Sequence, residues 1–205
     1  MAKPVAVPEH IVTLDQRLRQ EFDRTERLLE GLLAVARSQH APPGHTLSVA
    51  LDQLATDAVA QRAEEIAAKQ LSVDLQARAP AWVNGSEALL ARMVQNVIDN
   101  AILHNEPGGW IRIKAATAGP SVGFMVENGG DHLSQEDVDR LAEPFTRLGA
   151  PRTGSQTGTG LGLSIVASIA QAHAGSLVLQ ARPDGGLSVV VELPVSERTE
   201  AGDRL

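Results

Sequence analysis

In the N-terminal part of the chain, mostly apolar residues recur at the spacing that places them on one face of a helix. They are spaced alternately four and three residues apart, at Leu18, Phe22, Thr25, Leu29, Leu32 and Ala36. This heptad spacing predicts one helix over residues 13–38. A single helix cannot bury such a stripe alone. We therefore expect it to pack on a partner helix, on its own domain, or on a second chain in a homodimer.

The segments that flank this helix contain proline and glycine. Residues 1–12 include Pro4 and Pro8, which favour an extended conformation. Residues 39–46 include Pro42-Pro43-Gly44, which is typical of a turn that ends a helix. We therefore expect an extended segment, a helix and a linker to precede the main domain at residues 47–195.

The main domain mixes helical and strand patterns. We predict helices over residues 48–69, 86–104, 134–142 and 161–174, and strands over residues 71–77, 110–115, 122–128, 176–181 and 187–193. Trp82 and Val83 are expected to continue a hairpin with strand 71–77. Gly175 is expected to end the last helix in the left-handed conformation. Because the elements do not alternate strictly as strand–helix–strand units, they predict an α+β two-layer sandwich, with residues 196–205 as a polar tail.

Composition narrows the class of protein. The 18 basic and 25 acidic residues give a net charge of −7, which disfavours nucleic acid as a partner. The absence of cysteine excludes disulfides and thiolate metal sites. No apolar run reaches the roughly 18 residues that span a bilayer, and the first residues do not resemble a signal peptide. We therefore expect a soluble, cytoplasmic chain without a membrane segment.

A glycine-rich segment, Gly158-Thr159-Gly160-Leu161-Gly162-Leu163, runs directly into a predicted helix. Alternate glycines allow backbone N–H groups to approach a phosphate, and a helix N-terminus adds a favourable partial charge. A flexible loop explains the glycines equally well. The segment is not a P-loop, because no Lys-Ser/Thr follows, nor a Rossmann turn, because no strand precedes it.

Polar residues with a second possible role lie on the predicted helix 86–104. Asn96 and Asn100 are four residues apart, so they share one face, and His104 continues the row. The asparagines would either hydrogen-bond a neighbouring loop or serve as neutral oxygen ligands of Mg²⁺. A third polar segment, Asn128-Gly129-Gly130, follows a predicted strand and combines an amide with backbone that can approach a ligand closely.

In this order and spacing, the motifs resemble those of the catalytic domain of two-component sensor histidine kinases, in the GHKL ATPase superfamily. Residues 93–105 resemble the N box and residues 128–130 the first glycine box, while residues 143–145 resemble the F box and residues 158–163 the second glycine box. The likeness extends over about residues 14–195, and the wording of residues 104–110 is similar to actinobacterial members. It implies a mixed sheet covered on one face by helices.

The resemblance implies a role for each matched position. Asn96 and Asn100 would hold Mg²⁺ and orient the phosphates of ATP, and so take part in catalysis. His104 would lie against the nucleotide. Asn128 would contact the adenine amino group, and Gly130 would give the base room.

The F box, the second glycine box and the segment between them, called the lid, would surround the phosphates. The resemblance assigns nucleotide contacts there to Phe145, Arg147, Gly158, Thr159, Gly160, Leu161, Gly162 and Leu163. Residues 144–160 contain no acidic residue. Arg147 and Arg152 would therefore bring positive charge to the phosphates, with Arg152 acting in catalysis.

Three residues depart from the family pattern. Asn128 stands where the first glycine box usually starts with Asp, although an amide oxygen still accepts a hydrogen bond from adenine. His132 replaces the second glycine of that box and is expected to be a turn residue. Leu103 stands where a basic residue commonly precedes the position of His104, which removes one phosphate contact.

The phosphoacceptor histidine of the family has no counterpart here. Helix 13–38 resembles the second helix of the dimerisation and phosphoacceptor hairpin, with a Leu-Leu-x-x-Ala-Arg pattern at residues 32–37. His10 lacks the acidic residue, Arg and Pro of the acceptor motif. We therefore expect ATP-dependent transfer to a histidine on another polypeptide or a missing segment, for relay to a response regulator. The alternatives are a serine kinase resembling anti-sigma factors and a non-catalytic nucleotide-binding or dimerisation module. The parent kinase could be membrane-anchored.

Overall fold

The computed structural model describes residues 47–76, 81–143, 146 and 160–196. The strands are β1 (Leu47–Ala50), β2 (Ser72–Gln76), β3 (Trp82–Gly85), β4 (Trp110–Ala118), β5 (Ser121–Asn128), β6 (Ser176–Ala181) and β7 (Leu187–Pro194). The helices are α2 (Leu51–Gln61), α3 (Ala63–Ala68), α4 (Glu87–Leu103), α5 (Gln135–Asp139) and α6 (Gly162–Ala172). The predictions for residues 1–12, 13–38 and 39–46 lie outside the described residues, as does most of the predicted tail.

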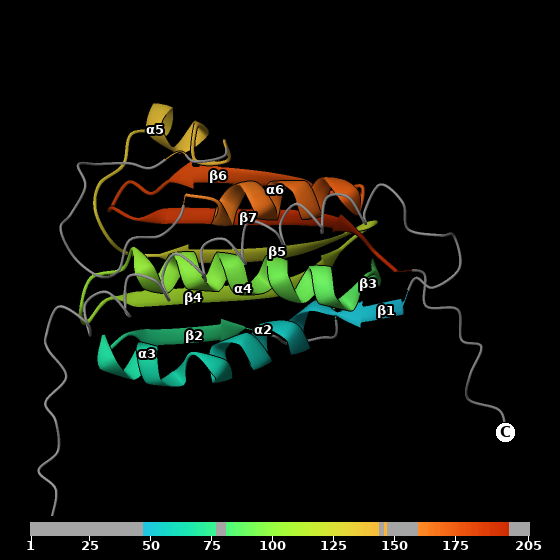
Figure 1. Ribbon diagram of the computed structural model, residues 1–205, viewed down its shortest axis with the longest axis horizontal. Coiled ribbons are helices and arrows are strands. Elements are labelled where there is room, and N and C mark those ends of the chain that lie inside the picture. Colours follow the sequence, from blue (N-terminus) through green and yellow to red (C-terminus); the bar gives the residue numbers. More distant parts are fainter. Residues whose placement is uncertain (1–46, 77–80, 144–145, 147–159, 197–205) are drawn as a thin grey trace, which may run out of the picture.

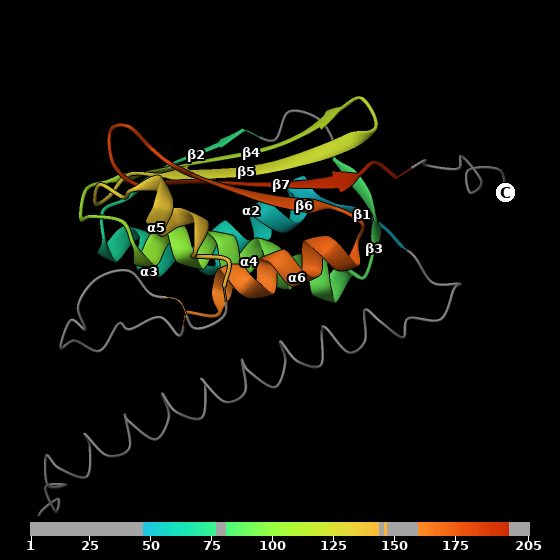
Figure 2. The ribbon, with the colours of Figure 1, turned by 90° about the horizontal axis from the view of Figure 1, so that it is seen from above.

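A mixed sheet forms one layer of the domain. Its strand order is β2-β4-β5-β7-β6, in which β2 and β4 are parallel and the other neighbours antiparallel. Helices α2, α3, α4 and α6 lie on one side of this sheet (Figure 2). Helix α4 lies between α2 and α6 and packs against both (Figure 1). The predicted α+β two-layer sandwich, with a mixed sheet covered on one face by helices, is confirmed.

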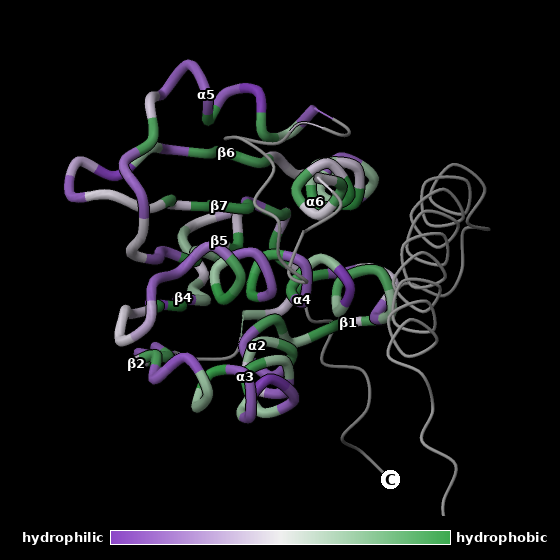
Figure 3. Tube along the Cα trace, turned by 60° about the vertical axis from the view of Figure 1, so that its left-hand side comes forward, coloured by the Kyte–Doolittle hydropathy of each residue, from purple (hydrophilic) through white to green (hydrophobic). Residues whose placement is uncertain are grey.

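The core lies between the sheet and the helices. Along β5 every second residue is buried, from Val122 through Phe124 and Val126 to Asn128. Leu90, Met93, Val94, Val97 and Ile98 are among the residues of α4 that face this layer and are buried. The hydropathy colouring in Figure 3 shows the same division, with largely green strands and a largely purple α5. Because β5 alternates in this way, its last residue, Asn128, points to the helix side.

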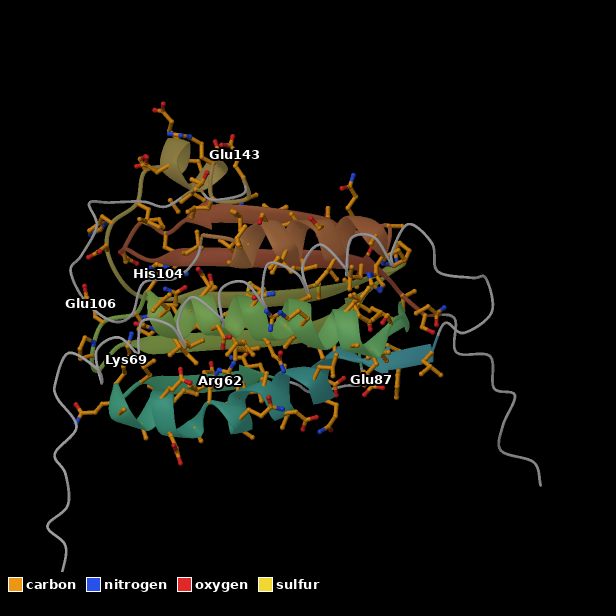
Figure 4. The ribbon with its side chains drawn as sticks, in the orientation of Figure 1. Arg62, Lys69, Glu87, His104, Glu106 and Glu143 are labelled. Atoms are coloured by element: carbon orange, nitrogen blue, oxygen red, sulfur yellow. The ribbon has the colours of Figure 1, made fainter. Side chains whose placement is uncertain are left out.

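Two cations anchor α4 from the side of α2 and α3 (Figure 4). Arg62 binds Asp99 through two hydrogen bonds, Nε to Oδ1 at 2.6 Å and Nη2 to Oδ2 at 3.0 Å. The hydrogen bond with Asp99 raises the pKa of Arg62 above its ordinary value. The Lys69 ammonium donates to the carbonyls of Ile102 at 2.8 Å and Leu103 at 2.9 Å, at the C-terminus of the helix. Burial lowers the pKa of Lys69.

A two-stranded sheet of β1 and β3 lies at the end of the domain where α4 begins. The two strands are antiparallel, and β3 also touches the chain after β7 through a bridge between Val83 and Val195. Ser196 is buried, donates its N–H to the Trp82 carbonyl at 2.8 Å and its hydroxyl to Asn84 Oδ1 at 2.6 Å. Ser196, the first residue of the predicted polar tail, is therefore fastened to the domain by these hydrogen bonds.

Residues 48–69 do not form the single predicted helix. Residues 47–50 are β1, which pairs with β3, and the helix is interrupted at Arg62. The Leu51 N–H donates to the Ala81 carbonyl, so pairing with a distant segment overrides the local helical pattern.

The predicted hairpin of strand 71–77 with Trp82 and Val83 is also wrong. Strand β2 pairs in parallel with β4, whereas β3 pairs with β1. Both pairings join segments far apart in the chain, and no local pattern predicts them. The other predicted elements agree with the structure within a few residues. Ser134 is the N-cap of α5, and its hydroxyl accepts from the Asp137 N–H at 3.1 Å.

His173 has the structural role that its position near a helix end favours. Its Nδ1 lies 2.8 Å from the Ile169 carbonyl, and its Nε2 accepts from the Ser86 N–H at 3.3 Å. A side chain on Gly85 would overlap the imidazole ring, so the glycine admits it. His173 thus joins the end of α6 to the start of α4.

Ala174, and not Gly175, adopts the left-handed conformation after α6. The φ angle of Ala174 is 56°, while Gly175 keeps an ordinary φ. A Cβ on Gly175 would overlap the Glu192 carbonyl oxygen and a methyl group of Leu193. The predicted left-handed conformation of Gly175 is therefore wrong. A glycine is needed at this position because the backbone lies close to β7.

Exchanging the residue types at these two positions should have opposite effects on the free energy of unfolding. We expect Ala174→Gly to raise it by about 1 kcal/mol, since an alanine in the left-handed region is strained by about that much. Gly175→Ala should lower it by roughly 1–3 kcal/mol through overlap with β7. Urea denaturation measures both, and equal effects of the same sign would contradict this assignment.

Among the described residues, no helix has both the length and the apolar composition needed to cross a membrane.

Candidate functional site

Three segments bring the predicted motifs to one region of the domain: the side of α4 that faces α6, the loop after β5, and the start of α6. On α4, Gln95 hydrogen-bonds to Gln61, the last residue of α2, and Asp99 to Arg62, the C-cap of α2. Asn96 follows Gln95, and Asn100 follows Asp99. Each asparagine therefore lies about 100° further around the helix, away from α2. His104 is the C-cap of α4 and is labelled at the C-terminal end of that helix in Figure 4.

Asn96 lies beside the second glycine box. A Cβ on Gly162 would stand 3.9 Å from Asn96 Oδ1, which is ordinary contact. The amide nitrogen of Asn96 is buried and has no hydrogen-bond partner among the described residues. A buried donor without a partner costs free energy, so this nitrogen is suited to a ligand acceptor such as a phosphate oxygen.

The backbone at the start of α6 is suited to bind an anion. Gly160 has φ 70°, a conformation that favours glycine, and the N-cap Leu161 contributes no side-chain hydrogen bond to the first turn. The side chains of Leu161 and Leu163 are buried. These two leucines, predicted to bind the nucleotide, can therefore offer only their backbone, and their side chains hold the start of the helix in place.

Asn128 presents a second unpartnered amide atom. It is 2% exposed, and its Nδ2 donates to the Gly129 carbonyl at 2.7 Å. Its Oδ1 is buried and accepts no hydrogen bond from the part of the chain that the structure describes. The amide is therefore oriented with its nitrogen occupied and its oxygen free to accept from a ligand.

Gly130 brings the loop after β5 against the end of α4. It has φ 144°, and a Cβ there would lie 2.7 Å from the His104 carbonyl oxygen. No side chain fits in this space. The first glycine box and the end of the N box are thus in direct backbone proximity.

The turn between β6 and β7 supports this loop from behind, a role that the sequence patterns do not reveal. The Gly186 N–H donates to the Asp131 carbonyl at 2.9 Å. A Cβ on Gly185 would overlap the Gly130 carbonyl oxygen, and one on Gly186 that of Asn128. The sequence predicts a turn at residues 183–186 from its Pro-Asp-Gly-Gly composition, but not its partner.

The departures from the family pattern have the following positions. Leu103 is half-buried, and its carbonyl accepts from Lys69. His132 is exposed in the segment between β5 and α5 and does not belong to a turn there, so the expectation of a turn residue is wrong. The other predicted site residues, Phe145, Arg147, Arg152, Gly158 and Thr159, lie outside the described residues.

The donors and acceptors of this region fit ATP and Mg²⁺. Asn128 Oδ1 is a buried acceptor suited to an amino group, and Asn96 Nδ2 is a buried donor suited to a phosphate oxygen. Asn100, half-buried and one turn after Asn96, carries a neutral amide oxygen. Mg²⁺ accepts such ligands when it shares its coordination shell with phosphates.

The family model for the histidine kinase-, DNA gyrase B- and HSP90-like ATPases matches residues 85–197. This match covers more than half of the chain and includes α4, the loop after β5 and α6. The chain therefore belongs to this ATPase family.

Within the family, the chain is similar to sensor histidine kinases. It is 38% identical over 189 residues to the sensor protein CutS of Streptomyces coelicolor, which covers 92% of this chain and 45% of CutS. The Acinetobacter baumannii histidine kinase AdeS superposes with a TM-score of 0.72 at 17% identity, over 94% of this chain and 88% of that one. Histidine kinase ThkA, solved in complex with response regulator protein TrrA, superposes with a TM-score of 0.68 at 19% identity, over 95% of this chain and 54% of that one.

These comparisons confirm the resemblance to histidine kinase catalytic domains. At such low identities the solved structures show the fold alone. The chain spans less than half the length of CutS.

We expect Asn96→Ala to raise the free energy of unfolding by about 1 kcal/mol. The substitution removes a buried donor without a partner and replaces a poor helix former by the best one. Gln95→Ala is the matched control, because Gln95 is the adjacent residue and its amide contacts Gln61. Thermal denaturation without nucleotide measures both, and a less stable Asn96→Ala protein would show that Asn96 is structural.

Proposed function

We propose that this chain is the ATP-binding catalytic part of a sensor histidine kinase, which transfers the γ-phosphoryl group of ATP to a histidine outside its own described domain. The observation that carries the proposal is the pair of buried, unpartnered amide atoms, Asn128 Oδ1 and Asn96 Nδ2. They belong to two different motifs and have the polarity that an adenine amino group and a phosphate require. A purely structural polar pair would be satisfied within the protein.

The proposed mechanism depends on positioning and charge neutralisation, which are the main requirements of phosphoryl transfer. Asn128 holds the base through its amide oxygen, and Gly130 admits the His104 carbonyl and so keeps the loop against the end of α4, which differs from the expected role of giving the base room. The start of α6 donates backbone N–H groups to the phosphates. Mg²⁺, held by Asn100 and Asn96 together with the phosphates, would neutralise charge on the transferred group. Arg152 is proposed to add positive charge in the transition state.

The proposed acceptor is a histidine on a phosphoacceptor hairpin, supplied by another polypeptide or by a segment of a longer protein. The similarity to CutS and the absence of an acceptor motif from the sequence support this. A response regulator would then receive the phosphoryl group, and the solved complex of ThkA with response regulator protein TrrA is consistent with such a partner. Residues 13–38 are proposed as a dimerisation helix.

Asn100→Ala should abolish Mg²⁺-dependent ATP binding and leave the fold intact. Asn100 is half-buried on the side of α4 away from α2 and makes no contribution to the buried core of that helix. Isothermal titration with ATP and Mg²⁺ measures binding, and circular dichroism measures the fold. Gln95→Ala is again the control and should bind as the unchanged protein does. An Asn100→Ala protein that binds ATP with unchanged affinity would contradict the proposed metal ligand.

Mixing the chain with radiolabelled ATP and a separate hairpin that carries the phosphoacceptor motif should give an acid-labile label on the hairpin. Arg152→Ala should slow this transfer more than it weakens ATP binding, because a group that acts in the transition state affects rate above affinity. Arg140→Ala is the control for loss of an exposed arginine before the lid. An acid-stable label on a partner would indicate a serine kinase instead. ATP binding without any transfer would favour the non-catalytic module.

A further inference from the structure

A charged cluster lies on the face of the sheet opposite the helices, behind the loop after β5. Glu127 precedes Asn128, so its side chain points to the opposite face. Its Oε1 accepts from Arg182 Nη1 at 2.6 Å and its Oε2 from Arg112 Nη1 at 3.3 Å. The side chains of Glu127 and Arg182 are only 17% and 19% exposed. This ion pair is therefore better shielded from solvent than a typical surface pair.

Trp110 lies at the centre of this cluster. The guanidinium carbon of Arg182 is 4.8 Å from the centre of its ring, and that of Arg112 is 5.4 Å away. Its carbonyl accepts from the Gly129 N–H at 3.2 Å and from Asn105 Nδ2 at 2.9 Å. A Cβ on Gly129 would stand 3.1 Å from the indole nitrogen. Trp110 thus touches the first glycine box and the segment after the N box.

Arg182 joins this cluster to the turn that supports the loop. Its N–H donates to the Gly186 carbonyl and its carbonyl accepts from the Gly185 N–H, both at 3.1 Å. The same residue therefore closes the turn with its backbone and binds Glu127 and Trp110 with its side chain. In this position, the turn donates the Gly186 N–H to the Asp131 carbonyl. It also packs directly against the backbone of Asn128 and Gly130.

We propose that Arg182 is a positioning residue for base recognition: it clamps the turn between β6 and β7 and the end of β5 around Trp110, and so fixes the backbone that presents Asn128 and Gly130. This inference rests on the proposed nucleotide site. Arg182 need not touch the nucleotide. It acts through the loop, and its effect should concern the base more than the phosphates, which contact α4 and α6.

The test compares binding of ATP and ITP, each with Mg²⁺, to the full chain. ITP lacks the 6-amino group that Asn128 Oδ1 is placed to accept, so the unchanged protein should prefer ATP. We expect Arg182→Ala to weaken ATP binding about ten-fold, the scale of one charged hydrogen bond, and to change ITP binding far less. The ratio of the two dissociation constants should therefore fall. Glu127→Gln, which retains the shape but not the charge, should shift the ratio in the same direction.

Lys114→Ala is the matched control, because Lys114 is another cation on the same face of β4, two residues beyond Arg112 and away from the loop. It should leave both dissociation constants unchanged. If Arg182→Ala does not fold, Arg182→Lys retains the charge without the planar fork and should give an intermediate ratio. Amide hydrogen exchange at Gly129 and Gly186 should be faster in the Arg182 variants than in the Lys114 control.

The outcomes separate this inference from the proposed function. An unchanged protein that binds neither nucleotide overturns the proposed function and, with it, the positioning role. An unchanged protein that prefers ATP, combined with an Arg182→Ala variant that has the same ratio, overturns the positioning role alone. A variant with a lower melting temperature and an unaltered ratio shows that Arg182 is structural and also overturns it.

Discussion

The burial of one face of α4 against the sheet is the constraint on which the rest of the site depends. Seven residues of this helix are buried, and they leave the opposite surface for polar groups. Arg62 and Lys69 hold the helix from the side of α2 and α3. The side towards α6 is thereby left to Asn96 and Asn100. A rotation of α4 about its axis would bury these amides and expose core residues, which the hydrophobic effect opposes.

Close backbone contacts make the second contribution. Gly130 lies against the carbonyl of His104, and Gly185 and Gly186 lie against the loop from the other side. Each approach excludes a Cβ, so the glycines act by admitting neighbouring backbone and not by making the loop flexible. The loop after β5 is held between the end of α4 and a turn. Rigid backbone on both sides gives Asn128 a defined direction, which a recognition residue requires.

The sequence predicts the fold class and most elements, because alternation along β5 and β7 and the apolar face of α4 are local signals. It also singles out Asn96, Asn128, Gly130 and Gly162 as one site, but only through the order of the family motifs; the structure places Asn96 beside Gly162 and Gly130 beside His104. The pairing of β1 with β3, the role of Gly175 and the cluster around Trp110 were not predictable. Each depends on contact between segments that are distant in the chain, where spacing carries no information. Residues of the lid remain predictions, since they lie outside the described residues.

The replacement of the usual aspartate by Asn128 follows a physical logic of its own. The Gly129 carbonyl lies 2.7 Å from Asn128 Nδ2, and a carbonyl can only accept a hydrogen bond. An aspartate in the same position would place a carboxylate oxygen against that carbonyl, which is repulsive unless the carboxyl is protonated. The amide removes this repulsion and at the same time directs its oxygen away from Gly129. Because the nitrogen is occupied, the amide cannot turn over to donate to a base without losing a hydrogen bond. Asn128 is thereby restricted to an acceptor role through Oδ1, which is the role proposed for it towards an amino group.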